Sequence, residues 1–130
     1  MLTALIAEQS PLIGHEIRQG LEAAGITVVE VVTDGAAAVE RALALRPSLI
    51  TIDLVLPRLS GLQVVAAIRR HGLLDTRVVV VSAVSSQASI IAAKEAGVSH
   101  YVLKPVPRSR LRELGLALAQ HARPLAQAAR

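Results

Sequence analysis

Four short apolar runs of this sequence end in polar residues of different chemistry. Glu8 and Gln9 follow "LTALIA", Asp53 follows "LITI", Ser82 follows "VVVV", and Lys104 follows "YVL". A carboxylate can be the nucleophile that becomes an aspartyl phosphate, and clustered carboxylate oxygens suit a hard cation such as Mg²⁺. A hydroxyl donates a hydrogen bond to a phosphoryl oxygen, and an ammonium neutralises its charge. These residue types predict phosphoryl transfer at a cation site if the fold brings them together.

Each residue taken alone also has a purely structural interpretation. Asp53 and Ser82 are typical of turns and helix caps, and Lys104 before Pro105 is typical of a strand end. Glu8 alone favours a contact with the positive end of a helix that begins near Ser10. The occurrence of all four at successive strand ends favours a shared site.

Five β-branched runs, at residues 2–7, 26–32, 48–52, 77–81 and 100–103, alternate with amphipathic segments. This pattern predicts an α/β fold, a doubly wound five-stranded parallel sheet in the flavodoxin-like order 2-1-3-4-5. The run at 26–32 carries a polar residue in its middle, which suits an edge strand. In that order the first and third strands are neighbours at the switch point. Glu8 and Asp53 should then face each other beyond the strand ends, with Ser82 and Lys104 alongside.

The helices between these strands carry recognisable start and stop signals. N-caps are expected at Ser10, Asp34, Ser60 and either Ser85 or Ser86, and Gly25 and Gly97 should end the first and fourth helices. The fifth helix, with Leu111, Leu114 and Leu118 inward, should end at Pro124. We therefore predict one domain over residues 1–123 and a short tail over 124–130.

The composition excludes several classes of protein. The chain has no cysteine, which excludes disulfides and thiolate metal sites and favours a reducing cytoplasm. No apolar run approaches the roughly 18–20 residues of a membrane span. The net charge is +4, with arginines concentrated near the end. These arginines lie among leucines at helical spacing and lack aromatic partners for bases, which favours a solvated helix face over nucleic-acid binding.

Taken together, these motifs resemble the receiver domain of two-component response regulators over nearly the whole chain. The matching segments are the acid after the first strand, "DLVLPRLSGLQV" from Asp53, "VVVVSA" with Ser82, and "AGVSHYVLKPV" with Lys104. The resemblance implies a module that takes a phosphoryl group from the phosphohistidine of a sensor histidine kinase or phosphotransfer protein. Asp53 matches the phosphoacceptor, Ser82 the hydroxyl residue of the family and Lys104 its lysine.

The resemblance also implies a switch and a cation site. Tyr101 matches the switch aromatic, which with Ser82 would remodel the face of the fourth helix, fifth strand and fifth helix for a downstream protein. Pro105 matches a position that often follows a cis peptide bond. Asp53, the backbone carbonyl of Val55 and Glu8 match the positions that hold Mg²⁺.

The sequence departs from this family at Gln9. Receiver domains usually carry two adjacent acids after the first strand, and the second is normally a direct Mg²⁺ ligand. The neutral amide of Gln9 offers only a carbonyl oxygen, so we expect it to contribute weakly or not at all and Mg²⁺ to bind weakly. Val55 and Val84 match positions that influence water attack on the acyl phosphate. Because both are apolar, we expect slow loss of phosphate.

The leading interpretation is a stand-alone receiver, a signalling module rather than an enzyme, acting as a monomer or weak homodimer by binding a partner protein. The alternative is a pseudo-receiver, a docking module that works without phosphorylation because of Gln9. A third class is a phosphatase similar to the haloacid dehalogenases, which also use an aspartyl nucleophile with Mg²⁺. Those enzymes carry a second aspartate two residues after the nucleophile, where this chain has Val55.

Overall fold

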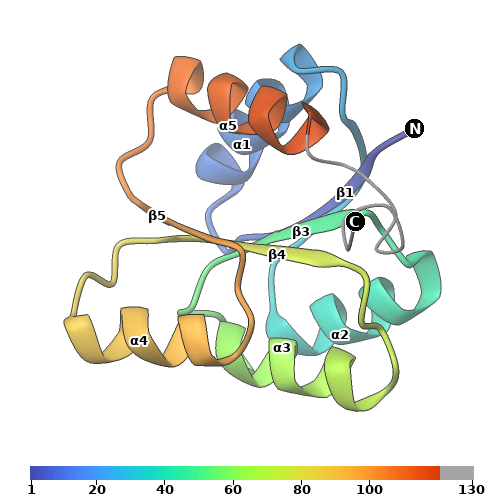
Figure 1. The fold of residues 1–130 in the computed structure, drawn as a ribbon, viewed down its shortest axis with the longest axis vertical. Helices are drawn as coiled ribbons and strands as arrows, with labels where there is room; N and C mark the ends of the chain where they lie inside the picture. Colours follow the sequence, from blue (N-terminus) through green and yellow to red (C-terminus); the bar gives the residue numbers. More distant parts are fainter. Residues whose placement is uncertain (121–130) are drawn as a thin grey trace.

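The computed structural model describes residues 1–120, which form a parallel sheet between two layers of helices (Figure 1). The sheet order is β2-β1-β3-β4-β5, and every neighbouring pair is parallel. The predicted fold class, strand order and edge position of the second strand are therefore confirmed. The strands are β1 (Thr3–Ala7), β2 (Thr27–Val32), β3 (Leu49–Ile52), β4 (Arg77–Ser82) and β5 (His100–Leu103).

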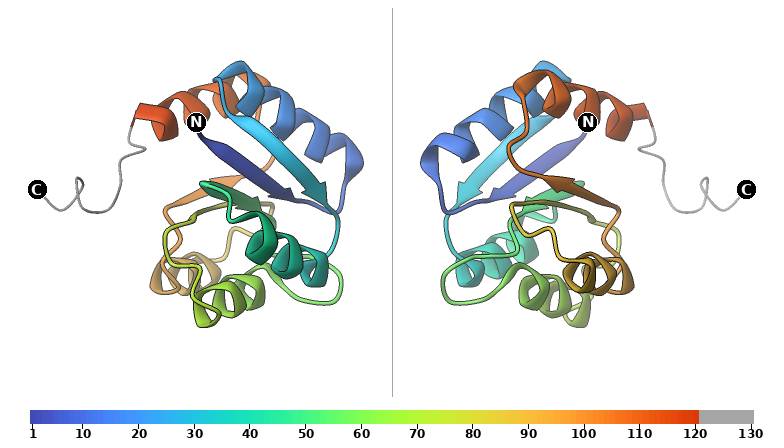
Figure 2. Two further views of the ribbon diagram at one scale, coloured as in Figure 1. Left: turned by 90° about the vertical axis from the view of Figure 1, so that its right-hand side faces the viewer. Right: turned by 90° about the vertical axis from the view of Figure 1, so that its left-hand side faces the viewer.

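The helices cover the sheet unequally. Helices α1 and α5 lie on one face, and α2, α3 and α4 lie on the other, as the two side views in Figure 2 also show. Each face buries its own aliphatic cluster, because side chains alternate along every strand. The helices are α1 (Pro11–Ala23), α2 (Gly35–Leu45), α3 (Gly61–Arg70), α4 (Gln87–Glu95) and α5 (Arg108–Gln120).

The predicted N-caps are confirmed. The side chains of four residues each accept a hydrogen bond from a backbone N–H in the first turn of their helix: Ser10, Asp34, Ser60 and Ser86. Ser86 rather than Ser85 therefore begins the fourth helix. Gly25 and Gly97 each lie one residue past the C-cap, at a φ of 86° that a side chain would disfavour.

The predicted strand bounds were wrong by one residue at four places. The first three strands begin one residue later than predicted, since residues 2, 26 and 48 precede the ladder, and β4 extends one residue further to include Ser82. Apolar character alone does not show where the hydrogen-bonded ladder begins. The predicted helix end at Pro124 and the domain boundary after residue 123 lie outside the described residues. Within residues 1–120, no helix is long and apolar enough to cross a membrane.

Glycines allow α1 and α5 to approach each other closely. A methyl group placed on Gly115 of α5 would lie 2.7 Å from the Cβ of Ala24, just past α1, and one on Gly20 of α1 would overlap the Cβ of Leu111. Helix α5 follows the loop that begins at Lys104. The contact with α1 therefore holds the far end of that loop against the sheet.

Candidate functional site

The carboxyl ends of β1, β3, β4 and β5 bring four predicted site residues together. Glu8, Asp53 and Ser82 are 2%, 6% and 0% exposed, so three polar side chains lie beneath the surface at one edge of the sheet. Parallel strands end at the same edge, which is why residues from four separate segments meet there. The sequence prediction that Glu8 and Asp53 face each other with Ser82 and Lys104 alongside describes this arrangement.

Asp53 is the centre of the cluster. Its Oδ2 lies 2.7 Å from Lys104 Nζ, and its Oδ1 accepts hydrogen bonds from Ser82 Oγ at 3.0 Å and from the backbone N–H of Val55 at 3.1 Å. Its own backbone N–H donates to the carbonyl of Ala7 on β1. Both carboxylate oxygens are thus held by donors, and the residue is fixed at the end of β3.

Glu8 and Lys104 form a second ion pair. Lys104 Nζ lies 2.6 Å from Glu8 Oε1, while Glu8 Oε2 accepts a hydrogen bond from the backbone N–H of Ser10 at 3.0 Å. Glu8 therefore contacts the start of α1 and also faces the site. Burial alone would lower the pKa of Lys104, but its hydrogen bond to Asp53, its close contact with Glu8 and the negative charges of both acids raise the pKa above its ordinary value.

The loop after β4 connects Ser82 with Tyr101. The backbone N–H of Val84 donates to Ser82 Oγ at 3.2 Å, and the hydroxyl of Tyr101 donates to the carbonyl of Val84 at 2.6 Å. Burial and the charge of Asp53 raise the pKa of Tyr101. Sequence reasoning missed the role of Val84, because the connection uses its backbone atoms and no side-chain type signals it.

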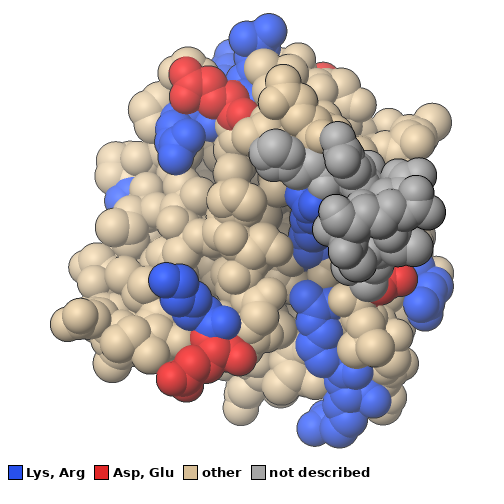
Figure 3. Space-filling view, viewed as in Figure 1, with Lys and Arg blue, Asp and Glu red and all other residues tan. Residues whose placement is uncertain are grey.

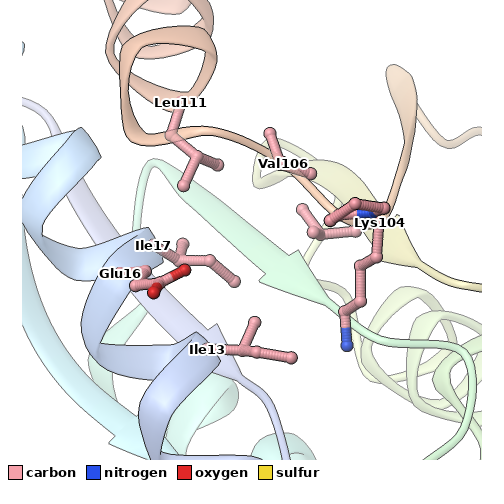
Figure 4. A pocket seen from close by; sticks show the side chains of 8 residues that line it. Ile13, Glu16, Ile17, Lys104, Val106 and Leu111 are labelled. Atoms are coloured by element: carbon pink, nitrogen blue, oxygen red, sulfur yellow. The ribbon is translucent and has the colours of Figure 1, made fainter.

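The segment after β5 borders the site on the α1 side. The peptide bond between Lys104 and Pro105 is cis. A pocket of about 90 Å³ lies between α1 and the start of α5, and Figure 4 shows the stem of Lys104 at its rim with the amine directed away from Leu111. Its lining is Ile13, Glu16, Ile17, Val81, Lys104, Pro105, Val106 and Leu111. The stem of Lys104 is therefore flanked by apolar side chains.

The donor set fits a cation, though with few charged ligands. The carboxylates of Glu8 and Asp53 are close enough to share one ammonium, so a cation fits between them. Gln9 is exposed in the bend after β1 and carries no charge. Among residues 1–120 there is no group of three histidine, cysteine, aspartate or glutamate side chains placed to hold a metal. Two carboxylates suffice for Mg²⁺, which often keeps several waters.

Comparisons with known proteins place this geometry in context. Residues 4–114 match the family described as the response regulator receiver domain. The chain is 37% identical over 116 residues to the response regulator protein PmrA of Pseudomonas aeruginosa and 28% identical over 109 residues to the chemotaxis protein CheY of Thermotoga maritima. It also resembles the solved signal receiver domain of the response regulator NarL from Mycobacterium tuberculosis, with a TM-score of 0.83 and 30% identity.

The extent of these matches differs among the relatives. The alignment covers 89% of this chain but only 52% of PmrA, so the chain spans about half the length of that relative. The CheY alignment covers 84% of this chain and 90% of CheY, and the NarL comparison covers 92% of this chain and 96% of the solved domain. The family match itself runs from residue 4 in β1 to residue 114 in α5.

Proposed function

Since this chain belongs to the response regulator receiver domain family, we propose that it accepts a phosphoryl group on Asp53 from a histidine kinase or phosphotransfer protein and signals by binding a partner protein. The observation that carries the proposal is the set of donors on Asp53. An ammonium, a hydroxyl and a backbone N–H converge on one buried carboxylate at the switch point of the sheet. Phosphoryl transfer needs little beyond such positioning and charge neutralisation.

In the proposed reaction an oxygen of Asp53 attacks the phosphorus of the donor. A P–O bond to Asp53 forms, the P–N bond of the phosphohistidine breaks, and its electron pair remains on the imidazole nitrogen. Lys104, Ser82 and the backbone N–H of Val55, which hold the free carboxylate, then donate to the phosphoryl oxygens. The same donors therefore serve the carboxylate before transfer and the phosphoryl group after it.

Receiver domains typically bind Mg²⁺ at the phosphorylation site. Here we propose that Asp53, Glu8 and the backbone carbonyl of Val55 would hold it, weakly and with little or no help from Gln9. When bound, Mg²⁺ supplies positive charge to the phosphoryl oxygens. Asp53 and Glu8 would have to exchange their contacts with Lys104 for this cation, since both carboxylates contact its ammonium.

The proposed surface for the downstream partner is the face of α4, β5 and α5. Tyr101 borders a groove of about 90 Å³ there, together with Ile90, Ala93 and Val98. Figure 3 views this face, and much of the surface between α4 and α5 carries no charged side chain. The hydrogen bond from Tyr101 to the loop after β4 gives this surface a direct connection to Ser82. A change at the phosphoacceptor would thereby alter what the partner contacts.

The proposed role is that of a signalling module that acts through a separate partner in the cytoplasm, since a cysteine-free chain suits a reducing compartment. The test of phosphorylation is the intact mass after incubation with acetyl phosphate and Mg²⁺. We expect a single phosphoryl adduct on the wild type and on Asp75→Asn, an exposed acid that serves as the matched control, and none on Asp53→Asn. An adduct retained by Asp53→Asn would contradict the assignment of the phosphoacceptor.

A second candidate is a docking module that works without phosphorylation. It is favoured by Gln9, which removes one acid from the expected ligand set. Absence of an adduct at every Mg²⁺ concentration, with the fold intact by circular dichroism, would support this candidate and contradict the first.

A further inference from the structure

Helix α2 contacts the loop that connects β3 with α3. The backbone N–H of Gly35, the buried first residue of α2, donates to the carbonyl of Pro57 at 3.0 Å. A methyl group on Gly35 would overlap the carbonyl oxygen of Leu59 and lie 2.6 Å from the Leu59 Cβ. The absence of a side chain at Gly35 therefore allows α2 to lie this close to the loop.

The same loop makes a strained turn at Arg58. Arg58 has a φ of 72°, which side chains disfavour, and the N–H of Leu59 donates back to the carbonyl of Pro57 at 2.9 Å. A three-residue turn with a positive φ at its centre is rare and strained. Strained backbone persists only where its surroundings hold it, and the N–H of Gly35 is a second donor to the same Pro57 carbonyl.

A second glycine fixes the start of the loop. The N–H of Gly61, the first residue of α3, donates to the carbonyl of Leu54 at 2.9 Å, and a methyl group on Gly61 would lie 2.5 Å from the carbonyl oxygen of Asp53. Val55 lies between the anchored carbonyls of Leu54 and Pro57, and its N–H donates to Asp53 Oδ1 at 3.1 Å. The direction of this donor therefore depends on both anchors.

Burial of the neighbouring leucines does not by itself explain how the Val55 N–H is directed. Leu54 and Leu56 are buried in the aliphatic core, but apolar burial is not directional and mainly sets the depth of the loop. The side chain of Val55 is exposed and does not fix its own peptide group. Hydrogen bonds are directional, so the contact at Pro57 is the feature that sets the path of the loop beyond Val55.

We propose that Gly35 is a positioning residue for phosphoryl transfer. By holding the Pro57 carbonyl it fixes the path of the loop, and it thereby keeps the N–H of Val55 directed at Asp53. A methyl group on Gly35 would force the loop to withdraw by about 1 Å to reach ordinary contact. The inference rests on the proposed function for the role of Asp53 as phosphoacceptor, but its main test does not involve phosphorylation.

The contact between Val55 and Asp53 can be measured without a phosphodonor. In ¹⁵N NMR spectra, Asp53→Asn should shift the Val55 amide signal of the otherwise unchanged protein, because the N–H loses a charged acceptor. In Gly35→Ala, we expect the same change at Asp53 to shift that signal by less than about half as much. Alanine favours a helix more than glycine does, so a weaker α2 would not explain this result.

Gly25→Ala is the matched control. Gly25 has a φ of 86°, so alanine there strains the backbone and destabilises the fold, while a methyl group at that position meets no atom of residues 1–120 within 4 Å. Gly25 precedes β2, at the edge of the sheet opposite the site. Gly25→Ala should therefore keep the full response of Val55 to Asp53→Asn, which separates positioning from a general loss of stability.

The rate of phosphorylation by acetyl phosphate, followed by intact mass, connects this contact with the reaction. Because a misplacement of about 1 Å can cost about 100-fold in rate, we expect Gly35→Ala to slow phosphorylation by about 10- to 100-fold. Gly25→Ala should stay within about twofold of the wild type. If the wild type itself takes up no phosphoryl group, the proposed function fails, while the NMR comparison still decides whether Gly35 directs Val55.

A second variant serves if Gly35→Ala does not fold. Arg58→Pro cannot adopt a φ of 72°, so it removes the turn at an exposed position and leaves α2 unchanged, whereas Arg58→Gly retains the turn and is its control. Arg58→Pro should weaken the response of Val55, and Arg58→Gly should not. A full response in Gly35→Ala, or in Arg58→Pro where the first variant does not fold, would overturn the proposal. Phosphorylation of Gly35→Ala at the wild-type rate would also overturn it.

Discussion

The contact between α1 and α5 at Gly115 allows a quantitative prediction. In Gly115→Ala the new methyl carbon would lie 2.7 Å from the Cβ of Ala24. Carbon atoms pack at about 3.5–4.0 Å, so the two helices would have to separate by about 1 Å. Such overpacking costs about 1–3 kcal/mol. The intrinsic preference of helices for alanine over glycine offsets about 1 kcal/mol of that cost.

A matched control separates these two effects. Gly14 of α1 is also a buried helical glycine, but a methyl group there would lie 3.3 Å from Val31 Cγ1 and in ordinary contact with Glu8, at 3.9 Å or more, which is far less crowded than at Gly115. Gly14→Ala gains the same helix preference, so the difference in unfolding free energy between the two variants should be about 1–3 kcal/mol, with Gly115→Ala the less stable. This corresponds to roughly 4 °C in Tm for each kcal/mol.

Moving the methyl group should restore stability. In Gly115→Ala combined with Ala24→Gly the two carbons no longer meet, so the double variant should be more stable than the sum of the single changes by about 1 kcal/mol or more. Urea unfolding followed by far-ultraviolet circular dichroism measures the wild type, the three single variants and the double variant. If Gly115→Ala is as stable as Gly14→Ala, or if Ala24→Gly restores nothing, the close approach of α1 and α5 is not a constraint on the fold.

Four further predictions concern the site. In the proposed reaction Ser82 donates a hydrogen bond to the phosphoryl oxygens, and a hydrogen bond to a charged group is worth about 1.5–3 kcal/mol, so phosphorylation of Ser82→Ala by acetyl phosphate should slow by about tenfold or more. An unchanged rate by intact mass would exclude Ser82 from the reaction. Because the pKa of Lys104 is raised on folding, its protonation stabilises the fold fully at a pH below the ordinary pKa of 10.5, and this stabilisation is lost as the pH rises through the raised pKa. Urea unfolding should therefore show a steeper loss of stability at alkaline pH in the wild type than in Lys104→Met. Equal losses would disprove the linkage. Gln9→Asp adds the missing acid, so Mn²⁺ binding followed by electron paramagnetic resonance should tighten by about tenfold, and no change would mean that this position lies too far from the cation. Val55→Asn combined with Val84→Glu provides side chains that can orient water, so the lifetime of the phosphoryl group should shorten. An unchanged lifetime would contradict the expectation that these valines slow the loss of phosphate.

Most of the fold could be predicted from the sequence because its signals are local. The buried strands are continuous aliphatic runs, and the caps at Ser10, Asp34 and Ser60 have side chains that bond to their own helices. Strand starts were less accurate, because the first ladder bond depends on the neighbouring strand. Thr27, for example, donates its backbone N–H to Leu2 of a segment far away in the sequence.

The sequence predicted which residues form the candidate site, but it did not predict which of their atoms contact one another. The strand order placed Glu8 beside Asp53, but it did not show that Lys104 contacts both acids or that Glu8 also accepts the N–H of Ser10. These contacts depend on rotamers and on the path of the backbone after β5. The connection from Ser82 to Tyr101 was likewise beyond the sequence, because it passes through the peptide groups of Val84.

Tyr101 dominates the optical properties of this protein. It is the only aromatic residue among the 130, which contain no tryptophan and no phenylalanine. Its phenol donates to Val84, whose N–H in turn contacts Ser82 beside Asp53. The near-ultraviolet absorbance and intrinsic fluorescence of the protein therefore arise from a single ring next to the loop that borders the site. Any rearrangement of that loop is expected to change the optical spectrum of the whole chain, so the unmodified protein carries its own optical probe.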